Sequence, residues 1–145
     1  MHSEIREQPF EPYAELLKYQ QAMQAAGRYG ATAVFVGSMR DINEDETVTA
    51  MELEHYPGMT ETYLHTLGVQ AAAHWDLIDS LILHRVGRVK PDDAIVLVAV
   101  WSAHRKDAFE ASRYLMEELK SSAPFWKKEQ TPEGERWVEN NTAGY

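Results

Sequence analysis

The chain has 145 residues, of which 44% are hydrophobic and 26% charged, a composition typical of one globular domain rather than of a disordered segment. Its formal charge of −9 disfavours nucleic acid as a partner, since basic surfaces recognise the phosphates of DNA and RNA. The sequence contains no cysteine, which excludes disulfides, thiolate metal sites and a cysteine nucleophile. No apolar run approaches the roughly 20 residues that span a bilayer, and the first residues lack the apolar stretch of a signal peptide. We therefore expect a cytoplasmic protein without a membrane partner.

Helix and strand patterns alternate along the chain without a regular βαβ repeat. In chain order we expect an irregular start (1–12), a helix (13–26), a strand (32–36), a mobile polar loop (41–47), a strand (48–56), a helix (61–75), two strands (81–89 and 94–101), a helix (104–121), two short strands (125–128 and 136–138) and an irregular end (140–145). This mixture favours an α+β fold, with a mixed or antiparallel sheet and packed helices, in one domain covering residues 1–145.

Two segments give more specific expectations. The strand at 94–101 is apolar throughout, so we expect it to be covered on both faces. Pro124 prevents the helix at 104–121 from continuing, and the chain can reverse its direction there.

Basic residues gather in one part of this acidic chain. Between residues 105 and 128 they are Arg105, Lys106, Arg113, Lys120, Lys127 and Lys128. A local cationic site on an acidic body indicates a small anionic ligand, whereas the alternative interpretation is a solvated helix face.

Two lysines flank the expected reversal at Pro124. Lys120 lies in the last helical turn, where a cation either offsets the helix dipole or points past the helix end into a cleft. If the chain doubles back, Lys127 comes near Lys120, and the repulsion between the two amines lowers at least one pKa. A lysine with a lowered pKa acts as a nucleophile or general base near neutral pH, and the same pair can bind a phosphate.

Other basic side chains follow predicted strands. His104 and Arg105 begin a helix directly after a buried strand, where outward-pointing backbone N–H groups commonly bind anions. A histidine near the helix cap and a surface arginine are the alternatives. Arg40 follows another strand, where it either closes over a ligand or pairs with a neighbouring carboxylate. His84 and Arg85 are interpreted as a satisfied strand pair. The six histidines show no paired spacing typical of metal ligands, so we expect no metal.

Several motifs, in the same order, resemble the large subunit of molybdopterin synthase. They lie at residues 35–40, 53–61, 84–87, 102–105, 119–129 and 131–138, and the most distinctive are His55-Tyr56-Pro57-Gly58-Met59 and Ala123-Pro124-Phe125-Trp126-Lys127-Lys128-Glu129. The resemblance implies an α+β fold with an α/β-hammerhead-type subdomain. It also implies a homodimer that carries one small ubiquitin-like subunit at each end, which makes a heterotetramer.

The activity that the resemblance implies is that of a sulfurtransferase in molybdenum cofactor biosynthesis. The small subunit would end in Gly-Gly carrying a thiocarboxylate, and its sulfur would convert cyclic pyranopterin monophosphate into the dithiolene molybdopterin. No metal or other cofactor is implied. Because the donor sulfur would sit on the partner, the absence of cysteine from this chain agrees with such an activity.

Site residues follow from the same resemblance, position by position. Lys120 and Lys127 fall on the two catalytic lysines, with Lys120 at the thiocarboxylate tail and Lys127 at the pterin or its phosphate. His104 and Arg105 would hold the substrate phosphate, with or without help from a second protomer. The residues expected to bind substrate are Phe35, Arg40, His104, Arg105 and Met116. Some relatives carry an arginine that reaches the neighbouring subunit, and this chain has Asn140-Asn141 in that stretch.

Two other functions remain open from the sequence. The chain would be a binding module if it held a ubiquitin-like tail without catalysis. A phosphate-ester hydrolase is the weaker alternative, since no metal ligands or activated hydroxyl stand out.

Overall fold

The computed structural model describes residues 1–43 and 45–138 of the chain. Its helices are α1 (Pro12–Ala22), α2 (Met59–His74) and α3 (Arg105–Ser121). Its strands are β1 (His2–Arg6), β2 (Ala31–Ser38), β3 (Ile42–Asn43), β4 (Glu46–Thr47), β5 (Ala50–His55), β6 (Leu77–Arg85), β7 (Gly87–Val89), β8 (Ala94–Ser102), β9 (Phe125–Thr131) and β10 (Gly134–Trp137). One sheet has the strand order β1-β6-β8-β2, a second has the order β10-β9-β5-β7, and β3 pairs with β4. The expected α+β fold is confirmed.

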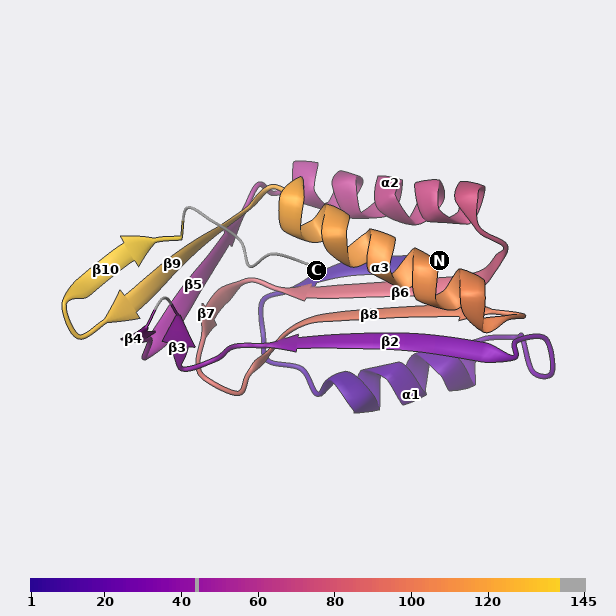
Figure 1. Cartoon of the computed structure of the whole chain (residues 1–145), viewed down its shortest axis with the longest axis horizontal. Coiled ribbons are helices and arrows are strands. Elements are labelled where there is room, and N and C mark those ends of the chain that lie inside the picture. The colour runs from indigo at the N-terminus through magenta and orange to yellow at the C-terminus, as the bar shows by residue number, and fades with distance from the viewer. Residues whose placement is uncertain (44, 139–145) are drawn as a thin grey trace.

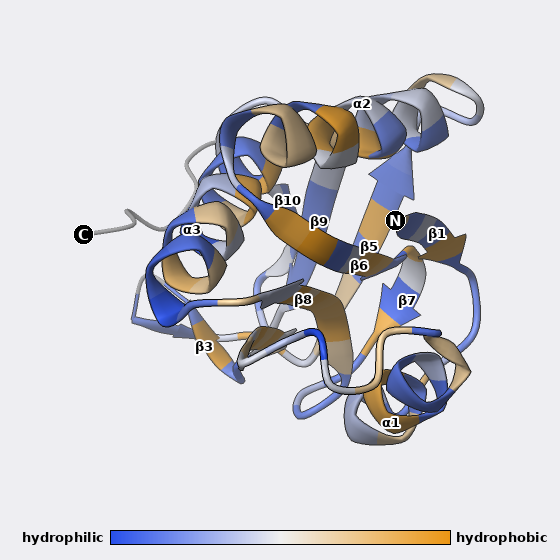
Figure 2. Ribbon diagram, turned by 90° about the vertical axis from the view of Figure 1, so that its right-hand side faces the viewer, coloured by the Kyte–Doolittle hydropathy of each residue, from blue (hydrophilic) through white to orange (hydrophobic). Residues whose placement is uncertain are grey.

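The first sheet lies between helices on both of its faces. Helices α2 and α3 cover one face and α1 covers the other (Figure 1). Alternate residues of β8 point to opposite faces, so Val98 packs with Leu64 and Leu115 under α2 and α3, while Trp101 packs under α1. The two central strands, β6 and β8, are accordingly hydrophobic (Figure 2). The expectation that the strand at 94–101 is covered on both faces is confirmed.

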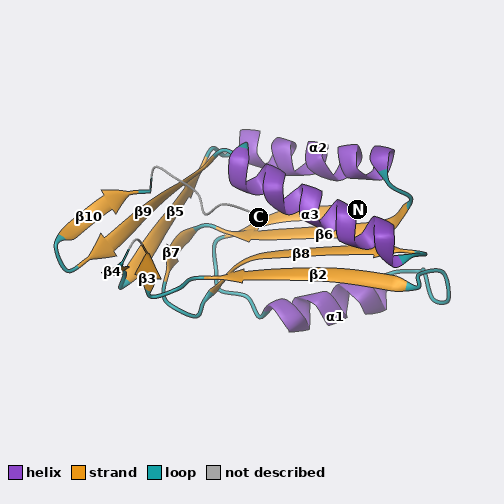
Figure 3. Ribbon diagram, viewed as in Figure 1, coloured by secondary structure: helices purple, strands orange, loops and turns teal. Residues whose placement is uncertain are grey.

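The second sheet lies at one end of the first and has a small core of its own (Figure 3). Strand β9 enters it directly after the turn that follows α3, and pairs antiparallel with β5 from His55↔Phe125 to Ala50↔Gln130. The strand expected at 81–89 is divided between the two sheets as β6 and β7. Gly87, the first residue of β7, has a φ of 86°, a conformation that glycine adopts without steric cost.

Two expectations for the irregular segments are wrong. Residues 2–6 are not irregular but form β1, which pairs parallel with β6 because the edge of β6 offers free backbone groups and Ile5 packs against the core. The loop at 41–47 contains the short β3-β4 hairpin. The end expected at 140–145, including Asn140-Asn141, lies outside the described residues. Across the part of the chain that is described, no helix is long and apolar enough to cross a membrane.

Candidate functional site

A cavity of about 660 Å³ opens where the C-terminal end of α3 meets β2 and the start of β9. Five of the residues predicted to form the site line it: Phe35, Arg40, Met116, Lys120 and Lys127. A smaller hollow of about 110 Å³ shares Lys120 and Lys127 with this cavity and extends to Asn43 and Glu129 on the side of the second sheet. The site therefore lies at the junction of the two sheets.

The two lysines come together because the chain reverses at Pro124. Lys120 occupies the last turn of α3, and Lys127 is the third residue of β9. Burial, the positive charge of Lys120 and a side-chain hydrogen bond with Lys120 lower the pKa of Lys127 to about 8. Glu129 acts in the opposite direction, because a nearby carboxylate favours the charged amine. The expected convergence of the two amines is confirmed, and their catalytic roles remain predictions.

His84 forms part of the cavity wall next to the lysines. Its ring stacks on Phe125, with centroids 3.8 Å apart and an interplanar angle of 12°. Nδ1 lies 2.8 Å from the backbone oxygen of Arg85, so Nδ1 carries the proton and donates it to that carbonyl. Burial lowers the pKa of His84 to about 3, with smaller contributions from the charges of Lys127 and Lys120. His84 therefore contributes a neutral imidazole to the cavity wall at physiological pH.

Sequence reasoning did not assign His84 to the site. The signal that was available is strand alternation: His84 is two residues after Ile82, whose side chain packs under α2 and α3, so both point to the same face of β6. The alternation does not show that this face also meets β9, because that contact depends on how the two sheets are joined.

Replacing His84 by glutamine is expected to reduce the loss of stability at acidic pH. The pKa of His84 is near 3 in the folded protein and 6.5 in the unfolded chain, so unfolding takes up a proton between these values. Stability from this residue is complete above pH 6.5 and falls by about 1.4 kcal/mol per pH unit below it. Urea unfolding at pH 7 and pH 5 measures the difference. His65→Gln, at an exposed position of α2, is the matched control and should follow the wild type. Equal acid sensitivity of wild type and His84→Gln would contradict this account.

His104 and Arg105 do not lie in the cavity. Both are exposed at the N-terminal end of α3, where His104 is the cap residue. A helical rise of about 1.5 Å per residue puts Lys120 about 22 Å farther along the axis than Arg105. Within one chain, Arg105 and Lys120 therefore do not meet, because α3 is a continuous helix that keeps its two ends apart. The predicted contact of His104 and Arg105 with substrate then requires a second copy of the chain.

Within the described ranges 1–43 and 45–138, no group of three or more histidine, aspartate or glutamate side chains is arranged to hold a metal ion.

Comparison with known proteins places the chain in a family. The family model for the MoaE protein matches residues 5–122. The molybdopterin synthase catalytic subunit of Ralstonia nicotianae is 53% identical over 137 residues, covering 93% of this chain and 75% of the relative. The subunit of the same name from Haemophilus influenzae is 47% identical over 135 residues, covering 93% of this chain and 87% of the relative. The chain therefore belongs to the MoaE protein family.

Solved structures agree with this assignment. The molybdopterin biosynthesis MoaE protein from Burkholderia ambifaria matches with a TM-score of 0.79 and 45% identity, covering 98% of this chain and 91% of that one. Molybdopterin synthase from Staphylococcus aureus matches with a TM-score of 0.83 and 32% identity, covering 94% of this chain and 96% of that one.

Proposed function

We propose that this chain is the catalytic subunit of a molybdopterin synthase. It transfers sulfur from the C-terminal thiocarboxylate of a small ubiquitin-like subunit to cyclic pyranopterin monophosphate, which yields the dithiolene of molybdopterin. The observation that carries the proposal is the lysine pair at the junction of the two sheets, where one amine has a pKa of about 8 and both face the same cavity. Membership of the MoaE protein family supports it.

The charge of the cavity suits the proposed reactants. A thiocarboxylate and a phosphate are both anions, and the cavity presents Arg40 and the two lysines to them. Lys120, at the end of α3, polarises the carbonyl of the tail or handles protons there. Lys127 contacts the pterin or its phosphate. The chain has no cysteine of its own, so the sulfur that is transferred arrives on the partner.

The proposed assembly has a homodimer at its centre and one small subunit at each end, in the cytoplasm. A protein–protein complex of subunits 1 and 2 of molybdopterin-converting factor from Helicobacter pylori contains a chain of this fold, with a TM-score of 0.78 and 24% identity. That complex supports a small partner subunit for this chain. The homodimer follows from the resemblance: if His104 and Arg105 hold the substrate phosphate, they reach a lysine site only in a second copy, since α3 separates them from the cavity of their own chain.

Reconstitution tests the function against the alternative of a binding module. The protein is mixed with a thiocarboxylated small subunit and cyclic pyranopterin monophosphate, and mass spectrometry follows both reactants. We expect the tail to lose its sulfur and the pterin to gain it. The same small subunit with an ordinary carboxylate is the control and gives no product. A stable complex in which both reactants keep their masses would favour a binding module and contradict the proposed activity.

A further inference from the structure

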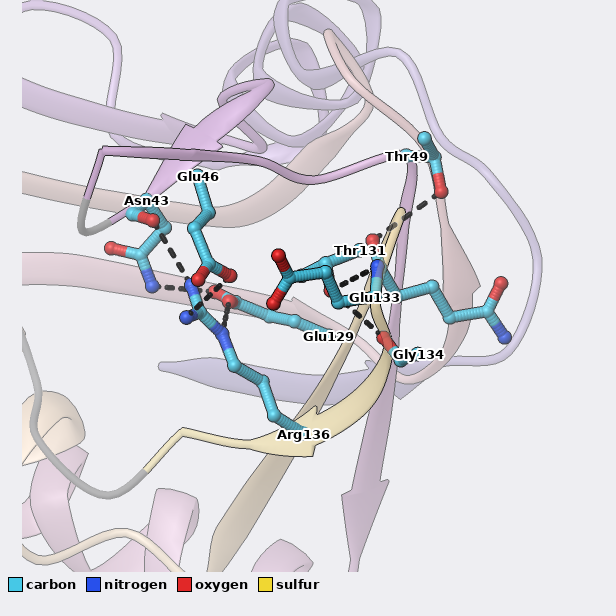
Figure 4. Close-up of polar contacts among 9 residues, drawn as sticks. Asn43, Glu46, Thr49, Glu129, Thr131, Glu133, Gly134 and Arg136 are labelled. Atoms are coloured by element: carbon cyan, nitrogen blue, oxygen red, sulfur yellow. Dashed lines mark hydrogen bonds and ion pairs between the residues drawn. The ribbon is translucent and has the colours of Figure 1, made fainter.

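A buried carboxylate lies beside the lysine site, and donors occupy both of its oxygens. The side chain of Glu129 is only 6% exposed. Its Oε1 accepts a hydrogen bond from Nδ2 of Asn43 at 2.6 Å, and its Oε2 accepts one from Nε of Arg136 at 3.0 Å. Figure 4 shows the amide, the guanidinium and the carboxylate in contact. Burial of a charged carboxylate is tolerated because it is paired in this way.

Arg136 links three segments of the chain at this point. It lies directly opposite Glu129 in the register of β10 and β9. Its Nη1 is 2.8 Å from Oε2 of Glu46, and its Nη2 donates to the backbone oxygen of Asn43 at 3.0 Å. Arg136, on β10, thus fastens the β3-β4 hairpin to β9, the strand that carries Lys127 and Glu129.

Glu129 and Lys127 share one face of β9. They are two residues apart on the strand, and both line the hollow of about 110 Å³. The carboxylate raises the pKa of Lys127, whereas burial and Lys120 on α3 lower it, and the lowering is the larger effect. The pKa of Lys127 therefore depends on the position in which the Glu129 carboxylate is held.

The other ionisable groups around Lys127 come from neighbouring elements. Arg40, after β2, lines the same cavity as a cation. His84 lines it from β6 and is neutral, and His55 on β5 is close enough to affect the pKa of His84. Among these groups from packed elements, Glu129 is the one that favours the charged form of Lys127.

We propose that Arg136 and Asn43 are positioning residues for Lys127: by occupying both oxygens of Glu129, they prevent this carboxylate from forming an ion pair with the Lys127 amine. If Arg136 is lost, the buried carboxylate lacks a charged partner, and the cations of the same hollow are Lys127, which lies on the same strand face, Lys120 and Arg40. An ion pair would return Lys127 to a permanently charged state. A role of these contacts in catalysis rests on the proposed function, whereas their effect on the charge of Lys127 does not.

The test measures the titration of Lys127 without any substrate or partner. The protein is acetylated briefly with acetic anhydride between pH 7 and pH 10, and mass spectrometry with fragmentation reports the labelling of Lys127 relative to Lys18 on α1. In Arg136→Met we expect labelling at pH 7.5 to be about tenfold slower than in the wild type, since one pKa unit changes the fraction of neutral amine tenfold. In Arg136→Met/Glu129→Gln we expect labelling at least as fast as in the wild type, because the competing carboxylate is gone.

Two further variants complete the design. Glu135→Gln breaks the ion pair of Lys128 on the opposite face of the same two strands and should leave Lys127 labelling unchanged. Asn43→Ala releases one carboxylate oxygen and keeps Arg136, so it should slow labelling in the same direction but less, which provides a result even if Arg136→Met does not fold. Unchanged labelling in both Arg136→Met and Asn43→Ala would overturn the proposal, as would equally slow labelling in the single and double variants of Arg136. Because the assay contains no reactants, its outcome is independent of whether the proposed sulfur transfer occurs.

Discussion

Replacing Lys120 by alanine is expected to abolish most molybdopterin formation, with a fall of about 10²–10⁴-fold, the contribution that a positioned proton-transfer group makes. Lys120 is in the last turn of α3, half-buried at the cavity, so its removal leaves the helix and the core of the first sheet in place. The measurement is single-turnover product formation from the thiocarboxylated small subunit and cyclic pyranopterin monophosphate. Thermal unfolding of the variant checks that the fold is retained.

Lys106→Ala is the matched control for this experiment. Lys106 lies on the same helix, its side chain is 79% exposed, and among the described residues it forms an ion pair with Glu110 one turn away. We expect wild-type turnover from it, since exposed pairs of this kind contribute little. Turnover near the wild-type level in Lys120→Ala would remove Lys120 from the mechanism. Slow turnover in both variants would indicate that overall charge, and not the position of Lys120, is what matters.

Replacing Lys127 by alanine is expected to raise the KM for cyclic pyranopterin monophosphate by at least tenfold while changing the affinity for the small subunit little. The reason is that a charged amine in a partly buried cavity binds an anionic phosphate with a charge-assisted hydrogen bond. Steady-state kinetics give the KM, and calorimetry gives the Kd of the small subunit. If only the binding of the small subunit weakened, the role proposed for Lys127 would be wrong.

The pH dependence separates the two chemical roles of this lysine. With a pKa of about 8, the amine loses its charge as pH rises through that value. A phosphate-binding role therefore predicts that the KM increases above pH 8. In Lys127→Arg the increase should be absent, because a guanidinium keeps its charge throughout this range. A kcat that instead rises through pH 8 and is lost in Lys127→Arg would assign Lys127 as a base or nucleophile.

The convergence of the lysines could be predicted because it depends on local signals. A helix with an amphipathic pattern, a proline that prevents its continuation and a β-rich segment directly after it leave the chain a short reversal, and Lys120 and Lys127 flank that reversal. The covered strand β8 could be predicted for a similar reason, since its apolar residues follow one another without a polar face.

The rest of the site depends on contacts between segments that are distant in sequence. The stack of His84 on Phe125 joins β6 to β9, and the hydrogen bonds of Asn43 with Glu129 and with Arg136 join residues more than 80 positions apart. No periodicity in the sequence encodes such pairs. Arg105 is a different case: its chemistry suits a phosphate, but α3 places it away from the cavity of its own chain, and its contact with substrate stays a prediction.

The two amines belong to elements that pack on different sheets. Lys120 is on α3, which packs on the first sheet, whereas Lys127 is in β9, a strand of the second sheet. The distance between the two amines therefore depends on the angle between the two sheets. A binding event that tilts the second sheet relative to the first would change the electrostatic repulsion that Lys120 exerts on Lys127 and so shift the pKa of Lys127.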